Sequence, residues 1–174
     1  MILPTAYWGP CSYMEQVLQD DVQIEVMESF EKQTFRNRCR ITDLQGREML
    51  LTVPVEKVER KQLTRDIRIA YRSRWQHQHW MALRSAYEHT PYFIYYADLI
   101  RPFYEKEIPW LVDLNDCLTQ VAAALMQRRI EADGTIHNAL RISHTADWQG
   151  QTWTDSHPWQ QQTSILDRLM REGA

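Results

Sequence analysis

The sequence predicts a single α/β domain in which helices pack on a mixed sheet that includes a β-hairpin. Three observations indicate this class. Apolar residues alternate with polar ones in several early segments, whereas later segments show the three- and four-residue spacing of helices. The segments follow the order strand, helix, several strands, three helices, a further strand and a final helix. The 174 residues are enough for one domain with a real core, so the range 1–174 is assigned to one domain.

The N-terminal segments predict a β-α-β arrangement. Residues 2–8 are apolar and extended, and Gly9-Pro10 ends them. Residues 11–19 have their apolar side chains on one helix face, and residues 21–28 alternate with period two, as a strand does. A strand, a short helix and a strand in this order suggest two parallel strands joined by a short crossover.

The next segments predict a β-hairpin. Residues 36–42 and 47–55 are strand-like runs on either side of a turn at 43–46, which contains a glycine. Pro54 favours a sheet edge or a strand end, because proline has no N–H to donate. Residues 65–71 alternate again and predict another strand.

The second half of the chain is predicted to be mainly helical. Residues 73–89 place apolar residues on one face, with Ser73 as the N-cap, and Thr90-Pro91 ends the helix. The further predicted elements are a helix at 92–107 broken by Pro102, a helix from Pro109 to about Arg129, a turn at Asp133-Gly134, a strand at 135–143, a loop at 145–162 and a helix at 164–173.

Composition excludes several function classes. The formal net charge of -3 argues against a nucleic-acid binder driven by bulk charge. No apolar run approaches the roughly 18–20 residues of a membrane span, and the N-terminus lacks the basic region of a signal peptide. Three cysteines without a CxxC spacing indicate reduced thiols, so we expect a cytoplasmic protein. Walker, GxGxxG and GxSxG motifs are absent from the sequence, and we predict no cofactor.

The stretch KQTFRNRCRI, residues 32–41, is the first candidate site. If it is a strand, Arg36, Arg38 and Arg40 share one face, and Asn37 and Cys39 share the other. The arginines then form a row of planar donors suited to phosphate or carboxylate. Asn37 among apolar neighbours needs hydrogen-bond partners, so it either fixes a backbone turn or holds a substrate group. The alternative is a solvated hairpin face whose arginines pair with surface acids.

Histidines in HQHW, residues 77–80, are the second candidate. On a helix, positions two apart point in different directions, so His77 and His79 do not chelate a metal together, and we predict no metal site. His79 falls on the apolar face, where a half-buried neutral imidazole is suited to act as a general base. The alternative is a core histidine with satisfied hydrogen bonds.

Seven segments, in order, resemble the WbqC-like family: LPTAYWGP, KQTFRNRCRI, LLTVPVE, RDIRIAY, WQHQHWMALRSAYEHTPYFIYY, RPFYEKE and SILDRLM. The resemblance covers roughly residues 2–130 and the last dozen. It implies a sugar- or acyl-modifying transferase, since some members of the family lie among genes for O-antigen and related surface sugars.

The resemblance also implies which residues form the site. The Arg-Asn-Arg motif of the family maps onto Arg36, Asn37 and Arg38. Further matches are Asp66, the His-Trp pair His79-Trp80, and Thr90-Pro91. Many members begin with a His-Gln-Pro-x-Tyr motif, of which only Pro4 and Tyr7 remain in this sequence.

Two hypotheses follow from these residues. In the first, a cytoplasmic transferase binds a small phosphorylated or thioester substrate, with Arg36 and Arg38 on the phosphate, Asn37 on the acceptor and His79 as base. Tyr7, Asp66 and Trp80 complete the expected substrate site. In the second, the protein is a non-enzymatic binding or scaffold protein whose contact patch includes Trp148, Trp153 and Trp159. A His79 that opens on a cleft lined by residues 36–38 favours the enzyme, and a His79 sealed in the core with a backbone partner favours the scaffold.

Overall fold

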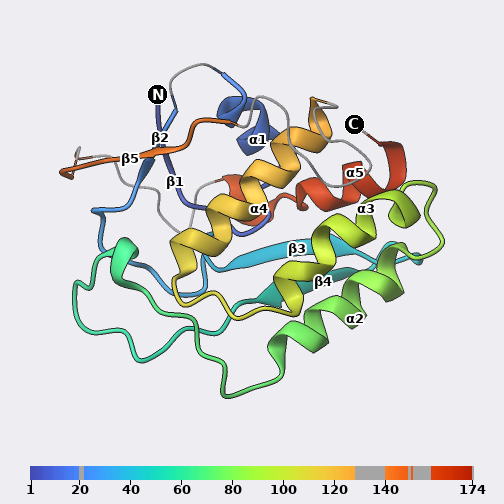
Figure 1. Cartoon of the computed structure of the whole chain (residues 1–174), viewed down its shortest axis with the longest axis horizontal. Coiled ribbons are helices and arrows are strands. Elements are labelled where there is room, and N and C mark those ends of the chain that lie inside the picture. The colour runs from blue at the N-terminus through green and yellow to red at the C-terminus, as the bar shows by residue number, and fades with distance from the viewer. Residues whose placement is uncertain (20–21, 128–139, 149, 151–157, 174) are drawn as a thin grey trace.

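The computed structural model describes residues 1–19, 22–127, 140–148, 150 and 158–173 (Figure 1). Its strands are β1 (Ile2–Pro4), β2 (Gln23–Glu25), β3 (Arg38–Thr42), β4 (Glu48–Thr52) and β5 (Ser143–His144). Its α-helices are α1 (Cys11–Val17), α2 (Trp75–Tyr87), α3 (Phe93–Ile100), α4 (Leu111–Met126) and α5 (Ile165–Glu172). Three short 3-10 helices are η1 (Thr64–Asp66), η2 (Arg101–Tyr104) and η3 (Pro158–Gln161).

Strands β1, β2 and β5 form a parallel sheet in the order β1-β2-β5. Helix α1 connects the two parallel strands β1 and β2, so the predicted β-α-β arrangement is confirmed. In the register of this sheet, Leu3 pairs with Ile24, and Ile24 pairs with His144. Leu3 and Ile24 are buried, because the side of the sheet on which they lie faces the core.

Strands β3 and β4 form the predicted antiparallel hairpin, in which Arg40 pairs with Leu50. The turn closes where Gly46 N donates to Asp43 O at 3.1 Å, and Gly46 has φ +78°, a backbone conformation that glycine adopts without strain. The α/β class with both parallel and antiparallel pairing is therefore confirmed. The two kinds of pairing form two separate sheets.

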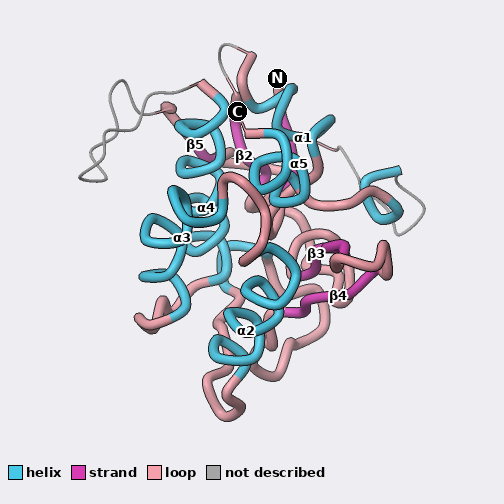
Figure 2. Tube along the Cα trace, turned by 90° about the vertical axis from the view of Figure 1, so that its right-hand side faces the viewer, coloured by secondary structure: helices cyan, strands magenta, loops and turns pink. Residues whose placement is uncertain are grey.

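Helices pack beside the hairpin and on one another. The hairpin lies between α5 on one side and α2 on the other (Figure 2). Helix α4 has the apolar face that its sequence predicts, with Leu111, Leu114, Leu118 and Leu125 all buried. It contacts α1, α3 and α5, and α5 in turn contacts β3. The core is thus one contiguous cluster to which both sheets contribute.

The predicted strand at 65–71 is wrong. The chain there forms η1 and then an extended segment with single bridges, Val55 to Ile69 and Arg68 to Trp110. Ile67 and Ile69 are buried, so the alternation in the sequence reflects a real buried side. Each neighbouring loop forms a single β-bridge with this segment, whereas a β-strand needs several consecutive paired residues.

Two boundaries also differ from the predictions. Helix α2 begins at Trp75 with Arg74 at the N-cap and no side-chain cap, so Ser73 does not cap it. Strand β3 begins at Arg38, so Arg36 and Asn37 lie in the preceding loop. The predicted turn at 133–134 and most of the predicted strand at 135–143 lie outside the described residues, although Ser143 at its end begins β5. The predicted loop at 145–162 contains η3.

Candidate ligand-binding groove

A groove with a volume of about 270 Å³ lies beside the hairpin. Three chain segments form most of it, residues 7–10, 33–40 and 159–164, which lie far apart in the sequence. Its aromatic lining residues are Tyr7, Trp8, Phe35 and Trp159. Its polar lining residues are Gln33, Arg38, Arg40, Gln160, Gln161, Gln162 and Ser164. Aromatic rings beside amide and guanidinium donors are the groups with which proteins bind hydroxylated ring compounds and oxyanions.

The segment 7–10 is fixed by backbone contacts from two directions. Tyr7 N donates to Phe35 O at 2.9 Å, and Ile165 N donates to Gly9 O at 3.0 Å. A Cβ on Gly9 would overlap the ring of Tyr13, so only glycine fits at this position. Trp8 has φ +45°, a conformation that is strained for a bulky residue. Such strain persists only where the surroundings hold the chain, and it is concentrated at binding sites.

Asn37 fixes the turn that brings Gln33 to the groove. Its Oδ1 accepts from Gln33 N at 3.1 Å, and its Nδ2 donates to Val53 O at 3.0 Å. The side chain is 3% exposed and does not line the groove. Of the two roles expected from the sequence, the backbone role therefore fits its contacts. Gln33 has φ +64°, so it is the second strained non-glycine residue in the lining.

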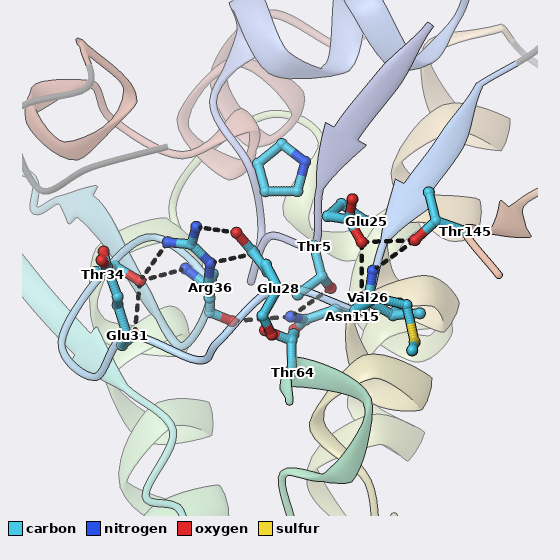
Figure 3. A network of polar contacts seen from close by, with 12 residues as sticks. Thr5, Glu25, Val26, Glu28, Glu31, Thr34, Arg36, Thr64, Asn115 and Thr145 are labelled. Carbon is cyan, nitrogen blue, oxygen red and sulfur yellow. Dashed lines mark hydrogen bonds and ion pairs between the residues drawn. The ribbon is translucent and has the colours of Figure 1, made fainter. Parts of the chain in front are cut away.

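Arg36 is buried and does not lie beside Arg38 on an exposed strand face. Its guanidinium makes a bidentate ion pair with Glu28, at 2.6 Å from Nε and 2.8 Å from Nη2 (Figure 3). Its Nη1 donates to Thr34 Oγ1 at 3.2 Å, and its carbonyl oxygen accepts from Asn115 Nδ2 at 2.8 Å. Burial raises the pKa of Glu28, and the arginine partly offsets this. Arg36 thus stabilises the 33–37 loop from inside.

The two remaining arginines of the stretch both line the groove, with different partners. Arg40 Nη1 lies 3.1 Å from Glu48 Oε2, and its Nε donates to Gln160 O at 2.9 Å. Among the described residues, Arg38 has one long contact, from Nη1 to Gln33 O at 3.5 Å. Its Nε is closed off from solvent and has no acceptor in this part of the chain, and the side-chain nitrogen of Gln160 is in the same situation.

Cys39 also lines the groove. Its thiol is buried, and burial together with the nearby charge of Asp167 raises its pKa. The thiol therefore stays protonated at neutral pH. A protonated thiol is a weak nucleophile, so Cys39 is part of the wall.

His79 lies behind the groove and does not line it. Its Nε2 is 3.1 Å from Thr52 O, and its Nδ1 is 2.9 Å from the hydroxyl of Tyr7. Burial lowers the pKa of His79 to about 4, and the contact with Thr52 opposes this only in part. The imidazole is neutral and 5% exposed, and it touches the groove only through Tyr7.

The other expected site residues lie elsewhere. Asp66 is exposed in η1, with its nearest cation, Arg65, at 3.6 Å. Trp80 packs between Phe93 and Tyr104, with ring centroids 6.1 Å from each. Neither Asp66 nor Trp80 lines the groove. The structure therefore brings together Tyr7 and Arg38 of the expected residues, with Asn37, Arg36 and His79 immediately behind them.

Sequence reasoning missed Trp8, Phe35 and the three glutamines 160–162 as lining residues, whereas Trp159 was expected in a contact patch. The Trp-Gly-Pro sequence at 8–10 could have indicated Trp8, since a tight glycine turn beside an aromatic residue indicates close packing there. The glutamines carried no such signal, because their place beside β3 depends on long-range contacts such as Ser164 N to Arg40 O at 2.7 Å.

The part of the chain that the structure describes contains no cluster of three metal-ligating side chains. No described helix is both long enough and apolar enough to cross a membrane. His77 is exposed and His79 buried, on different sides of α2, as the helical spacing predicts.

Comparison with protein families gives one match. The model of the WbqC-like protein family matches residues 6–155, which is most of the chain. No curated protein and no solved structure matches the sequence.

Proposed function

The chain belongs to the WbqC-like protein family, and from this premise we propose that it acts in surface polysaccharide biosynthesis of the O-antigen kind. In this proposal it is a transferase that binds an activated sugar or acyl donor, either phosphorylated or thioester-linked, in the groove beside the hairpin. The observation that carries the proposal is the groove itself, in which aromatic walls stand beside Arg38 and several amide donors.

The proposed roles follow from the contacts. Arg38 binds the anionic part of the donor, and Tyr7 and Trp8 contact its ring. Arg36, Asn37 and His79 are positioning residues, because each is buried and holds a segment that lines the groove.

Ligand-dependent stabilisation tests the proposal. We expect at least one nucleotide sugar, sugar phosphate or acyl thioester to raise the unfolding temperature, because a ligand present at about 100 times its dissociation constant adds on the order of 2.7 kcal/mol. Arg38→Gln should remove the shift. Arg84→Gln is the control, because it removes an exposed arginine of α2 that does not line the groove. If no phosphorylated or thioester ligand stabilises the unmodified protein, the proposal is wrong.

A specific observation favours a second candidate, a non-enzymatic binding protein. Among the described residues, the groove lining includes neither a carboxylate nor a histidine, and burial raises the pKa of both Tyr7 and Cys39. His79 is sealed with Thr52 O as a backbone partner. The described lining thus offers no group poised to take a proton.

The aromatic contact patch expected for this candidate is not formed as a unit. Trp148 is exposed, whereas Trp159 is 6% exposed in the groove wall, and Trp153 lies outside the described residues. The groove would then be the binding surface in both candidates. Incubation with a bound donor and a set of acceptors separates them, since only the transferase consumes the donor.

A further inference from the structure

The groove contains one arginine whose charge is compensated and one whose charge is not. Glu48 lies within ion-pair distance of Arg40, whose Nε is also engaged with Gln160 O. Arg38 is half-buried, and among the described residues no carboxylate pairs with it. A partly desolvated cation without a counter-charge is unfavourable, and an anionic ligand removes this penalty. The groove is therefore built for a single negative group.

Unsatisfied donors support the same conclusion. Arg38 Nε and the side-chain nitrogen of Gln160 are shielded from water and have no acceptor among the residues that the structure describes. Buried donors are nearly always satisfied in folded proteins, so two exceptions on side chains that line one groove indicate an absent partner.

The size of the groove limits the ligand. Its volume of about 270 Å³ lies just below the range of roughly 300–1,000 Å³ that holds drug-sized ligands. A nucleotide sugar combines a base, a ribose, a diphosphate and a second sugar. Its diphosphate also consists of two separate phosphate groups, which proteins commonly hold with several cations or a metal ion. The described residues offer neither a second uncompensated arginine in the lining nor a metal cluster.

We propose that the groove selects a single-ring sugar that bears one oxyanion, a phosphate or a carboxylate, with Arg38 as its counter-charge and Gln160 as a second donor. This inference rests on the proposed function, because it takes the groove as the substrate site of the transferase, and it excludes nucleotide-linked sugars as the ligand. Arg40 acts by holding Gln160 in place.

Calorimetric titration of the full chain tests this selectivity. The probes are a set of hexose 1-phosphates and 6-phosphates, the corresponding uronates, the neutral hexoses and the nucleotide sugars that carry the same hexoses. We expect a hexose monophosphate or a uronate to bind, the neutral hexose to bind at least about tenfold more weakly, and the nucleotide sugar to bind no better than the neutral hexose. Comparison of the hexose phosphates with the uronates shows whether the groove binds a phosphate or a carboxylate. Binding of either kind supports the proposal.

Three variants test which arginine provides the counter-charge for the bound oxyanion. Arg38→Gln should weaken binding by about tenfold or more, Arg40→Gln by clearly less, and Arg84→Gln should leave it unchanged. Unfolding temperatures without ligand show whether each variant is folded.

Two groups of outcomes overturn the inference and separate it from the proposed function. If a nucleotide sugar or a thioester binds and no single-ring oxyanion does, or if Arg40→Gln weakens binding as much as Arg38→Gln, the inference fails and the proposed function stands. If no sugar or thioester donor binds at all, both fail.

Discussion

Four side chains, two of which line the groove, form a chain of hydrogen bonds whose donors and acceptors can all be assigned. Thr52 O only accepts, so His79 Nε2 carries the proton at 3.1 Å, and Nδ1 of the neutral ring accepts from the hydroxyl of Tyr7 at 2.9 Å. The oxygen of Tyr7 then accepts from Tyr104 at 2.8 Å, and the oxygen of Tyr104 accepts from Trp8 Nε1 at 2.9 Å. Two groove residues, Tyr7 and Trp8, are thereby tied to α2, η2 and β4.

Protonation of His79 is incompatible with this chain of hydrogen bonds. A charged imidazole carries a proton on Nδ1 as well, which would face the proton that Tyr7 donates. Tyr7 would have to turn its proton towards Tyr104, whose own proton would then need another acceptor. Burial of the ring and the hydrogen-bond order therefore both favour the neutral form, in agreement with the lowered pKa of about 4.

The lowered pKa of His79 predicts a pH dependence of stability. Between pH 6.5, its ordinary pKa, and about 4, the unfolded chain binds a proton that the folded chain does not. The free energy of unfolding should therefore fall by on the order of 3 kcal/mol as pH decreases through this window. Above pH 6.5 the stabilising contribution of the neutral His79 is fully present. Urea unfolding at a series of pH values measures the slope.

His79→Gln is the comparison for this measurement, since glutamine keeps a hydrogen-bonding side chain that does not titrate. The buried Glu28, whose pKa is raised, contributes a slope of opposite sign in both proteins, so it cancels in the difference. Equal slopes in the two proteins would show that His79 is not a buried neutral histidine.

At the scale of elements, the loop before β3 depends on a buried ion pair. Glu28, next to β2, and Arg36 are 6% and 1% exposed, and their two hydrogen bonds lie inside a larger polar network (Figure 3). Arg36 Nη1 also donates to Thr34 within the loop, and the carbonyl oxygen of Arg36 accepts from Asn115 of α4. The rim residues Gln33 and Arg38 lie on either side of the anchored residues, so the ion pair positions the polar side of the groove.

Removal of one partner of this pair should be strongly destabilising. Arg36→Met leaves Glu28 buried without its cation, and we expect a loss of about 3–5 kcal/mol in the free energy of unfolding. Arg47→Met is the matched control, because it removes an arginine that is 73% exposed in its pair with Asp43 and should change stability by less than about 1 kcal/mol.

The double variant Glu28→Gln/Arg36→Met separates the pair from the rest of the network. It should lose less stability than the sum of its two single variants, because the second substitution removes the unpaired buried charge. If the losses simply add, the two residues do not act as a pair.

The helices and strands were predictable from the sequence where the spacing of apolar residues or a glycine-containing turn determines the secondary structure. The alternation in 21–28, the glycine-containing turn at 43–46 and the spacing in 73–89 each predicted the correct kind of element. Arg36 and Asn37 were placed in the strand, because alternation alone does not show where a strand begins. The inward direction of Arg36 depends on Glu28, a tertiary partner that no local pattern reveals.

At the scale of the whole molecule, the groove exists because α5 brings the end of the chain beside its beginning. Ser164 bridges to Pro10, and its N–H donates to Arg40 O at 2.7 Å. Asp167 in α5 accepts from Thr42 Oγ1 at 2.8 Å, which fixes the helix on β3. Sequence reasoning predicted α5 but could not predict the groove, since these contacts join segments more than 100 residues apart.

Helix α5 lies beyond the range of the family match, which ends at residue 155, and yet it should be indispensable to the fold. Leu169 is fully buried, whereas the adjacent Arg168 is exposed with a weak contact to Glu15 at 3.7 Å. Leu169→Ala should lower the free energy of unfolding by about 2–5 kcal/mol, because it leaves a cavity in the core. Arg168→Ala, one position away on the same helix, should change it by less than about 1 kcal/mol. Urea unfolding of the two variants checks this, and similar small losses in both would mean that α5 is not packed on the core.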